Sequence, residues 1–434
     1  MTDAEIIIIG GGASGLMAAR ELARAGRKVI ILEARDRLGG RIHTLEDPGF
    51  DTVAEGGAEF VHGRLSVTFG LLQEAGLTWQ AIEGDIWRHI NGSLSREDDF
   101  IENGELLTAR LRELTEDMSI QSFLDLYFAE EKYTLLKESV RGYIEGYDAG
   151  DTSRASAYAL RDDWAGEGHE EQYRVRGGYV KLIRFLEQES RVRGCSIYQS
   201  AVVKEIRWQK GHVEIFTESG NRYTGQKCVV TLPLGVLQLS PDNKAAVIFS
   251  PALPATNSDF QAMGFESVIK ILLQFKVAFW KDGHLKQHSG INVKNLGWLF
   301  SDESVPTWWT QLPSKSALLT GWIAGPKAQE LKQATQDVIL QNALDSLVSL
   351  FGLSKVSLSE QLDMAKVFNW TADPFTQGAY AYTTTETAQA IQRLSKPVED
   401  TLFFAGEALH DGPQMGTVEG ALASGLRVAE QVLS

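Results

Sequence analysis

Apolar runs of two different periods alternate at the start of the chain. Residues 6–9 are four isoleucines in a row, a continuous run that suits a strand buried on both faces. Apolar residues then recur at helical spacing over 13–25, and Gly26 stands where a helix would end. A second apolar run over 28–32 ends in Glu33. The pattern predicts strand, helix and parallel strand, the first unit of an α/β sheet.

Three glycines lie between the first strand and the helix. Gly10, Gly12 and Gly15 have the spacing G-x-G-x-x-G. The first permits a tight turn, the second lets the backbone approach a pyrophosphate, and the third lets the helix pack on the strand. The helix N-terminus offers free N–H groups to phosphates, and Glu33 can accept hydrogen bonds from a ribose diol. An accidental glycine turn is the alternative, but strand, helix, second strand and acid together favour dinucleotide binding.

A second glycine turn follows at once. Residues 35–41 read Arg-Asp-Arg-Leu-Gly-Gly-Arg, and guanidinium forks suit phosphate recognition. The string LEARDRLGGR resembles the second fingerprint of the flavin-containing amine oxidases, the superfamily of monoamine oxidases, polyamine oxidases and the lysine-specific histone demethylase. The resemblance implies an α/β fold, with a Rossmann-type FAD-binding domain (GR2-like) and an inserted α+β substrate-binding domain.

The character of the chain changes three times after this unit. Short strands and then helices rich in Glu, Leu and Arg begin near residue 78, the cofactor pattern returns after residue 172 with a helix over 180–191, and a second excursion begins near residue 263. We therefore expect an FAD-binding domain from 1–77, 172–262 and 396–434. The substrate-binding domain would comprise 78–171 and 263–395. Within the latter we expect two helices, over 328–340 and 341–350.

Composition narrows the function classes. The formal net charge of −15 over 434 residues disfavours general nucleic-acid binding and is weakly compatible with cationic substrates. Only two cysteines occur, Cys195 and Cys228, both in or near apolar strands, which fits buried thiols and a reducing compartment. Neither a leader nor a membrane-spanning run is visible. We expect a cytoplasmic protein without a membrane partner, as a monomer or homodimer.

Two residues are candidates for the flavin's reactive side. The glycine-rich segment 53–63 matches a family segment beside the isoalloxazine, which implies that His62 faces the substrate; the alternative is a loop histidine with a structural hydrogen bond. Lys270 is the single charge in the apolar strand expected over 268–275, a costly place unless the lysine is paired or functional. The resemblance implies that Lys270 holds a water against flavin N5. The alternative is a lysine on an edge strand with its head in solvent.

The last third of the chain adds two family-specific strings. Residues 370–380 read W-x-x-D-P-x-x-x-G-x-Y, which implies that Trp370 packs near the flavin and Tyr380 forms one wall of an aromatic cage around the amine. The second string runs from 402 to 421 and predicts a strand, an acid, a glycine-rich loop and the start of a helix; its Glu407 resembles the carboxylate that binds the ribityl chain. A helix that starts at Thr417 and Val418 should point its positive end at the flavin pyrimidine ring and stabilise the reduced form.

The motifs and the resemblance together assign two sets of residues. Val203 enters only by resemblance, as the valine whose backbone contacts the adenine. The expected cofactor-binding residues are Gly10, Gly12, Ala13, Ser14, Gly15, Glu33, Ala34, Arg35, Gly39, Gly40, Arg41, Gly57, Ala58, Glu59, Phe60, Val203, Thr231, Trp370, Gly406, Glu407, Thr417 and Val418. The expected catalytic residues are His62, Lys270, Trp370, Tyr380 and Thr417.

Two departures from the family pattern bear on cofactor and substrate. Ala379 stands where mitochondrial monoamine oxidases carry the cysteine that bonds to the flavin, so we expect noncovalent FAD. Thr417 replaces the second cage tyrosine, which resembles the polyamine oxidases and the histone demethylase. We expect no metal site, because His284 and His288 lie in a polar glycine-containing loop.

The predicted activity is oxidation of the C–N bond of a primary or secondary amine, with polyamines among the candidate substrates. Hydride transfer to flavin N5 would give an imine, then an aldehyde, and molecular oxygen would leave as hydrogen peroxide. Alternatives within the superfamily are a protoporphyrinogen oxidase-like enzyme or desaturase, or an L-amino acid oxidase, which would need an arginine for the substrate carboxylate. A different class is a flavin-bound protein that only recognises amines or a partner chain.

Overall fold

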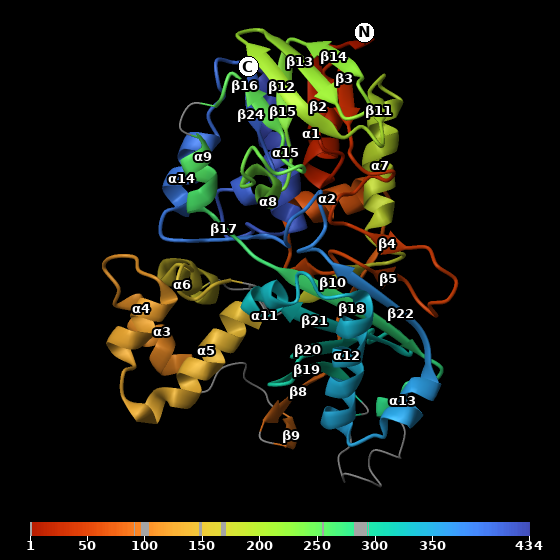
Figure 1. The fold of residues 1–434 in the computed structure, drawn as a ribbon, viewed down its shortest axis with the longest axis vertical. Helices are drawn as coiled ribbons and strands as arrows, with labels where there is room; N and C mark the ends of the chain where they lie inside the picture. Colours follow the sequence, from red (N-terminus) through yellow and green to blue (C-terminus); the bar gives the residue numbers. More distant parts are fainter. Residues whose placement is uncertain are drawn as a thin grey trace.

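A parallel five-stranded sheet organises the upper lobe of the molecule (Figure 1). The computed structural model describes residues 2–90, 92–96, 104–146, 150–165, 171–253, 256–281, 293 and 295–434. The sheet has the order β11-β3-β2-β15-β24. Its strands are β2 (Ile6–Ile9), β3 (Val29–Leu32), β11 (Ser196–Tyr198), β15 (Lys227–Val230) and β24 (Leu402–Phe404).

Alternating isoleucines of β2 build the cores on the two faces of this sheet. Ile6 and Ile8 belong to the apolar cluster formed with helices α1 (Ala13–Arg24), α7 (Val180–Arg191) and α15 (Val418–Leu433). Ile7 and Ile9 belong to the cluster on the other face, where a second sheet packs. The order of that sheet is β1 (Thr2–Asp3), β14 (Arg222–Gly225), β13 (His212–Thr217), β12 (Val203–Gln209) and β16 (Ile248–Ser250).

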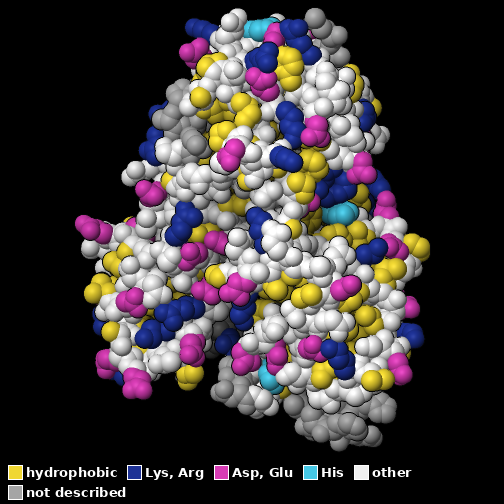
Figure 2. All heavy atoms as spheres, in the orientation of Figure 1, with side chains coloured by type: hydrophobic (Ala, Val, Ile, Leu, Met, Phe, Trp, Pro, Cys, Tyr) yellow, Lys and Arg dark blue, Asp and Glu magenta, His cyan; other side chains and the backbone are white. Residues whose placement is uncertain are grey.

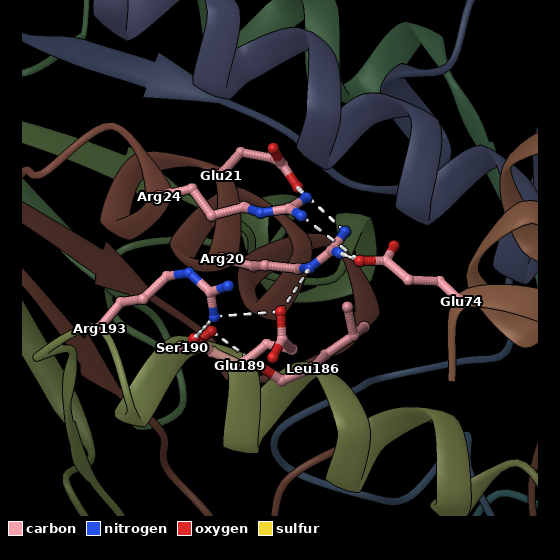
Figure 3. A network of polar contacts seen from close by, with 8 residues as sticks. All are labelled: Arg20, Glu21, Arg24, Glu74, Leu186, Glu189, Ser190 and Arg193. Carbon is pink, nitrogen blue, oxygen red and sulfur yellow. Dashed lines mark hydrogen bonds and ion pairs between the residues drawn. The ribbon is translucent and has the colours of Figure 1, made fainter. Parts of the chain in front are cut away.

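A buried arginine forms ion pairs with carboxylates of three helices beside this core (Figure 3). Arg20 of α1 is 2% exposed and forms ion pairs with Glu21 of its own helix and with Glu74 of α2 (Ser66–Glu74). Its Nε lies 3.9 Å from the carboxylate of Glu189 on α7, which also pairs with Arg193. We interpret this network as structural, because none of these side chains lines the cavity described below.

A seven-stranded sheet forms the lower lobe, next to an arm of helices (Figure 1). Helix α12 (Gln336–Phe351) packs on one face, against Ile269, Ile271 and Leu273. The sheet order is β22 (Leu362–Asn369), β18 (Val268–Phe275), β21 (Leu318–Ala324), β20 (Thr307–Thr310), β19 (Leu296–Ser301), β8 (Asp85–Ile90) and β9 (Ser93–Arg96). The helices of the arm are α3 (Gly104–Arg112), α4 (Ile120–Tyr127), α5 (Thr134–Gly146) and α6 (Ala157–Ala165).

Shorter elements complete the two lobes. The small sheets are β6 (Val61–His62) with β10 (Gln172–Val175) and β7 (Trp79–Ala81), β4 (Thr44–Leu45) with β5 (Ala54–Glu55), and β17 (Gly264–Phe265) with β23 (Ala381–Tyr382). The remaining helices are α8 (Leu234–Leu237), α9 (Thr256–Ala262), α11 (Gly325–Glu330), α13 (Lys355–Gln361) and α14 (Thr387–Leu394). Across the described ranges, no helix is long and apolar enough to cross a membrane.

The predicted boundary between the helices 328–340 and 341–350 is wrong. The first helix, α11, ends at Glu330, and α12 begins at Gln336 and runs unbroken to Phe351. Pro326 at the start of α11 and the side chain of Thr335, which accepts a hydrogen bond from the Val338 N–H, set these starts. The proposed division into two domains by residue number stays a prediction.

Candidate functional site

One cavity of about 2640 Å³ joins the glycine turn of the upper lobe to the helical arm of the lower lobe. Every predicted cofactor-binding and catalytic residue except Gly15 lines it. Segments 78–171 and 263–395 therefore line the same cavity as the glycine turn at 10–15. The individual roles of these residues stay predictions.

The first glycine turn leaves room where a phosphate is expected. A Cβ built on Gly15 would lie 2.0 Å from the Gly10 carbonyl oxygen, so this glycine serves the close packing of α1 on the strand. A Cβ on Gly12 would meet nothing within 4 Å. The buried Ser14 hydroxyl at the start of α1 has no hydrogen-bond partner among the described residues. Open space, an unpaired donor and a helix N-terminus fit the pyrophosphate of FAD.

The acid after the second strand holds this turn together. Glu33 is buried, and its Oε2 accepts a hydrogen bond from the Gly11 N–H at 2.6 Å. Its Oε1 accepts one from the Arg35 N–H at 2.8 Å. Burial raises the pKa of Glu33 above its usual value, against the lowering effect of these two N–H groups. A carboxylate oxygen can accept more than one hydrogen bond, so a ribose hydroxyl remains compatible with this arrangement.

The arginines of the second fingerprint pair with carboxylates far along the chain. Arg35 makes a two-pronged pair with Asp373, with Nη1–Oδ2 at 2.9 Å and Nη2–Oδ1 at 2.6 Å. Arg41 Nη1 donates to Glu407 Oε1 and to the Ala379 carbonyl oxygen, each at 2.6 Å. Phosphates were the predicted partners of these guanidinium forks, and neither carboxylate pair was foreseen from the sequence. The two pairs hold the last third of the chain against residues 35–41.

Lys270 lies at the centre of a buried ion network. It belongs to β18, which is paired on both sides, and it is 1% exposed. This excludes the edge-strand alternative. Its Nζ donates to Glu59 Oε2 at 2.7 Å and to the Gly57 carbonyl oxygen at 3.0 Å. An ammonium group has three donors, so a third remains for a water in the cavity that Lys270 lines.

The Glu59 carboxylate is shared by several donors. Its Oε1 accepts from Arg174 Nε at 2.8 Å and from Trp309 Nε1 at 3.1 Å. Burial would raise the pKa of Glu59, but Lys270 and Arg174 outweigh it and lower that pKa to about 2. Glu59 was predicted to lie at the cofactor, whereas Arg174 and Trp309 were missed. The available signal was the lone lysine of an apolar strand, which needs a buried acid.

Aromatic side chains surround the cavity near Lys270. Trp370 is buried, and its Nε1 donates to the Gly56 carbonyl oxygen at 2.9 Å. Tyr380 stacks on Trp322, with ring centroids 6.5 Å apart and planes at 17°. Trp298 also lines the cavity, and neither it nor Trp322 was identified from sequence. The arrangement supplies flat apolar walls with few polar groups.

The residues at the ends of two elements complete the lining. His62 sits on β6, in register with Gln172 of β10, with its ring 6.1 Å from that of Phe60. Thr417 caps α15: its Oγ1 accepts from the Gly420 N–H at 3.1 Å and donates to the Gln414 carbonyl oxygen at 2.7 Å. The positive end of α15 therefore starts at the cavity wall.

The glycines of the 53–63 segment have a packing role that the sequence did not reveal. A Cβ on Gly56 would lie 2.6 Å from the Phe368 ring, and one on Gly57 would lie 1.8 Å from the Arg41 carbonyl oxygen. Their small size lets protein segments approach each other. The expected contact of this segment with the isoalloxazine stays a prediction.

The described residues give little support for thiol or metal chemistry. Cys195 and Cys228 are buried, and burial raises the pKa of Cys195 to about 12 and that of Cys228 further. His284 and His288 lie outside the described residues. His89, Asp302 and Glu303 place ligand atoms within 4.8 Å of one another, but Asp302 is 70% exposed. That the protein needs no metal stays a prediction.

The chain resembles flavin enzymes over nearly its whole length. A family model described as flavin containing amine oxidoreductase matches residues 13–433. The chain is 26% identical to lysine-specific histone demethylase 1 homolog 2 of Oryza sativa subsp. japonica, with 99% of the chain and 57% of the relative covered. It is 27% identical to probable polyamine oxidase 4 of Arabidopsis thaliana, with 98% and 86% covered. The chain thus spans little more than half of the demethylase relative.

Solved structures show the same fold at low identity. Wild-type putrescine oxidase bound to putrescine superposes with a TM-score of 0.78 at 20% identity, covering 99% of each chain. Cyclohexylamine oxidase from Brevibacterium oxydans IH-35A gives a TM-score of 0.77 at 19% identity, covering 99% of this chain and 98% of that one. These matches confirm the predicted fold class, a Rossmann-type flavin-binding domain with a substrate-binding domain.

Proposed function

Because the chain belongs to the flavin-containing amine oxidoreductase family, we propose that it oxidises the C–N bond of a primary or secondary amine with bound FAD. The observation that carries this proposal is the single cavity that joins the phosphate-sized turn at Gly12 to Lys270 and the aromatic walls. When bound, FAD would supply the hydride acceptor at N5 and pass the electrons to molecular oxygen, which leaves as hydrogen peroxide.

The side chains around Lys270 would prepare the amine for this step. The flat walls of Trp370, Tyr380 and Trp322 orient the substrate and exclude water. An apolar site favours the neutral amine over the ammonium ion, and the neutral form is the one that can release a hydride. The remaining donor of Lys270 would hold the water that assists reoxidation or hydrolyses the imine.

Acidic residues in the outer cavity favour a substrate with more than one positive charge. Figure 2 shows acidic and basic side chains interspersed over one face of the molecule, so the overall charge does not mark a single patch there. The part of the cavity lining that the helical arm supplies has a clearer bias. Its charged residues are Glu105, Asp117, Glu138, Glu145, Asp162 and Asp163, against Arg141. This supports a polyamine or another extended cation.

A peroxide-coupled screen of the FAD-loaded protein tests the proposal. The panel holds monoamines, polyamines and amino acids, each mixed with the enzyme and oxygen, with flavin bleaching followed without oxygen. Peroxide from diamines or polyamines is the expected result. Bleaching without peroxide would indicate a dehydrogenase, and silence across the panel with FAD bound would contradict the proposal and favour a desaturase or a binding protein.

An L-amino acid oxidase is the second candidate, favoured by two arginines of the cavity lining that lie outside the second fingerprint. Arg88 of β8 and Arg141 of α5 supply guanidinium groups that could not be placed from the sequence. Such groups could bind a substrate carboxylate. Amino acids in the same screen decide between the two candidates.

We expect the flavin to bind without a covalent bond. Ala379, which is buried and lines the cavity, carries no nucleophile. Acid precipitation of the yellow protein should leave the colour in the supernatant, as measured by absorbance. Colour that stays with the precipitate would show a covalent link made by another residue.

Replacing Gly12 by Ala should weaken FAD binding without destabilising the fold. Nothing in the protein lies within 4 Å of the new methyl group, so the group would occupy space that the pyrophosphate needs. We expect roughly tenfold weaker binding or more, equivalent to about 1.4 kcal/mol, in a titration of FAD fluorescence.

Two other glycines provide the comparison. Gly70 in α2 also has nothing within 4 Å of a built Cβ but lies outside the cavity lining, so Gly70→Ala should bind FAD normally. Gly15→Ala should instead destabilise the fold, because its methyl group would clash with the Gly10 carbonyl oxygen. Equal FAD affinity in Gly12→Ala and Gly70→Ala would argue against a pyrophosphate at this turn.

A further inference from the structure

A second, smaller cavity lies behind the Lys270–Glu59 pair. Its volume is about 190 Å³, and a site needs only about 10–15 Å³ of such space to hold one water. Val53, Ala81, Arg176 and Ser314 line it and are exposed, whereas Glu55, Glu59 and Gln311 line it and are buried. The cavity therefore leads from solvent to buried carboxylates.

Glu59 separates the two cavities. It is the residue that lines both of them within the described part of the chain. Lys270 lines the larger one and donates to Glu59 Oε2, while Arg174 lines the smaller one and donates to Oε1. A path from the smaller cavity to the reactive side of the larger one thus crosses a single side chain.

Glu55 is the other buried acid of this path. Its Oε1 accepts from the Tyr179 N–H at 2.8 Å, but its Oε2 has no hydrogen-bond partner among the described residues. A buried carboxyl oxygen without a partner is costly unless water or a proton satisfies it. Burial raises the pKa of Glu55 to about 7. Against this, the Tyr179 N–H, Thr44 and Lys270 lower the pKa, while Glu59 raises it further.

We propose that the smaller cavity is a proton path to the catalytic cavity, in which Glu55 exchanges a proton with solvent and Glu59 passes one to Lys270. The inference rests on the proposed function, in which Lys270 serves the reoxidation of the flavin. Lys270 gives up a proton on the catalytic side, and the neutral lysine no longer lowers the pKa of Glu59. Glu59 then takes a proton from Glu55 through water of the smaller cavity and passes it to Lys270, and solvent returns a proton to Glu55.

The chemistry requires such a proton. Oxidation of a neutral amine, RCH2NH2, to the iminium ion RCH=NH2⁺ removes a hydride, which carries two electrons and one proton. Reduction of O2 to H2O2 consumes those electrons and two protons, so one further proton must arrive in each turnover. The smaller cavity opens to solvent on the other side of Glu59 and supplies this proton whether or not the larger cavity holds a substrate.

Reoxidation of dithionite-reduced, FAD-loaded enzyme by oxygen tests the path without knowledge of the substrate. Glu55→Gln should slow reoxidation, on the order of a hundredfold, as loss of acid–base assistance does. The wild-type rate should fall as pH rises through about 7, because Glu55 loses its proton, and the variant should lose that pH dependence. Glu55→Asp should restore part of the reoxidation rate and part of its pH dependence. Ser314→Ala, at the exposed end of the smaller cavity, should behave as wild type.

Two further measurements keep the test independent of activity and of folding. The infrared band of protonated carboxyl groups that titrates near neutral pH should be weaker in Glu55→Gln than in the wild type, and the remaining band belongs to Glu266, whose pKa burial also raises to about 7. Should Glu55→Gln fail to fold, Ala81→Leu, which narrows the exposed end, must slow reoxidation instead. A folded Glu55→Gln with wild-type reoxidation at every pH overturns the path. Failure of the proposed function would be seen separately, as flavin that no amine reduces.

Discussion

Replacing Lys270 by Met should lower kcat by roughly a hundredfold or more while FAD stays bound. Methionine keeps the length of the side chain but removes the donors to Glu59 and to the water that we place beside the flavin. Arg174 and Trp309 still hold Glu59, so the buried acid keeps two donors. Stopped-flow measurement of flavin reduction and of reoxidation will show which half of the reaction loses rate.

Lys366 offers a matched control on the neighbouring strand of the same sheet. It lies on β22, where its register partner is Leu272, and its side chain is 46% exposed with Asp47 as its ion-pair partner. Lys366→Met should therefore turn over at the wild-type rate. Unchanged kinetics in Lys270→Met would remove Lys270 from the mechanism, and an equal loss in both variants would point to a structural cause.

Replacing Glu59 by Leu should give the largest loss of stability, about 3–5 kcal/mol in the free energy of unfolding. The substitution leaves Lys270, which is 1% exposed, and Arg174 without their shared anion. Two like charges would then remain in a place from which water is largely excluded. Urea unfolding of the FAD-loaded protein, followed by tryptophan fluorescence, measures the change.

The double variant Glu59→Leu with Lys270→Met separates charge from packing. Removing the lysine along with its partner should recover part of the loss, because only Arg174 then lacks the anion. Glu205→Gln is the surface comparison, since Glu205 pairs with an exposed Arg207 and should shift the unfolding midpoint little. A double variant as unstable as the sum of the single variants would show that the ion pair is not the cause.

The shifted pKa values of Glu59 and Glu55 predict how the free energy of unfolding depends on pH. The pKa of Glu59 is about 2 in the folded protein, below the value of 4.5 for a free glutamate, so its contribution is present above pH 4.5 and is lost as pH falls toward 2. The pKa of Glu55 is about 7, so its contribution is present below pH 4.5 and is lost as pH rises toward 7. Glu55→Gln should therefore show a smaller decline than the wild type between pH 4.5 and 7, because Glu266, whose pKa is also raised to about 7, still contributes.

Elements governed by local spacing were predicted closely. The helix over 180–191 and the strands over 6–9 and 268–275 have the predicted limits. In each case the apolar period lies within the element itself. The break between α11 and α12 was missed because two apolar periods follow each other there, and Thr335 was not recognised as the cap.

Pairings across long separations could not be predicted from spacing. Lys270 and Glu59 are 211 residues apart, Arg35 and Asp373 are 338 apart, and Arg41 and Glu407 are 366 apart. All of these partners except Asp373 were among the expected site residues, but the sequence does not say which cation faces which anion. That choice depends on how the segments 53–63 and 370–380 pack against β18 and the first fingerprint.

The sequence by itself determined the family, the flavin-binding fold and the residues that gather at one site. Glycine spacing, a buried strand and a helix start are local properties of the backbone, and they can be read directly. Only the tertiary structure decided that Glu59 serves Lys270 and that a second cavity opens behind this pair. The physical reason is that ion pairing and cavities arise where segments from distant parts of the chain pack together.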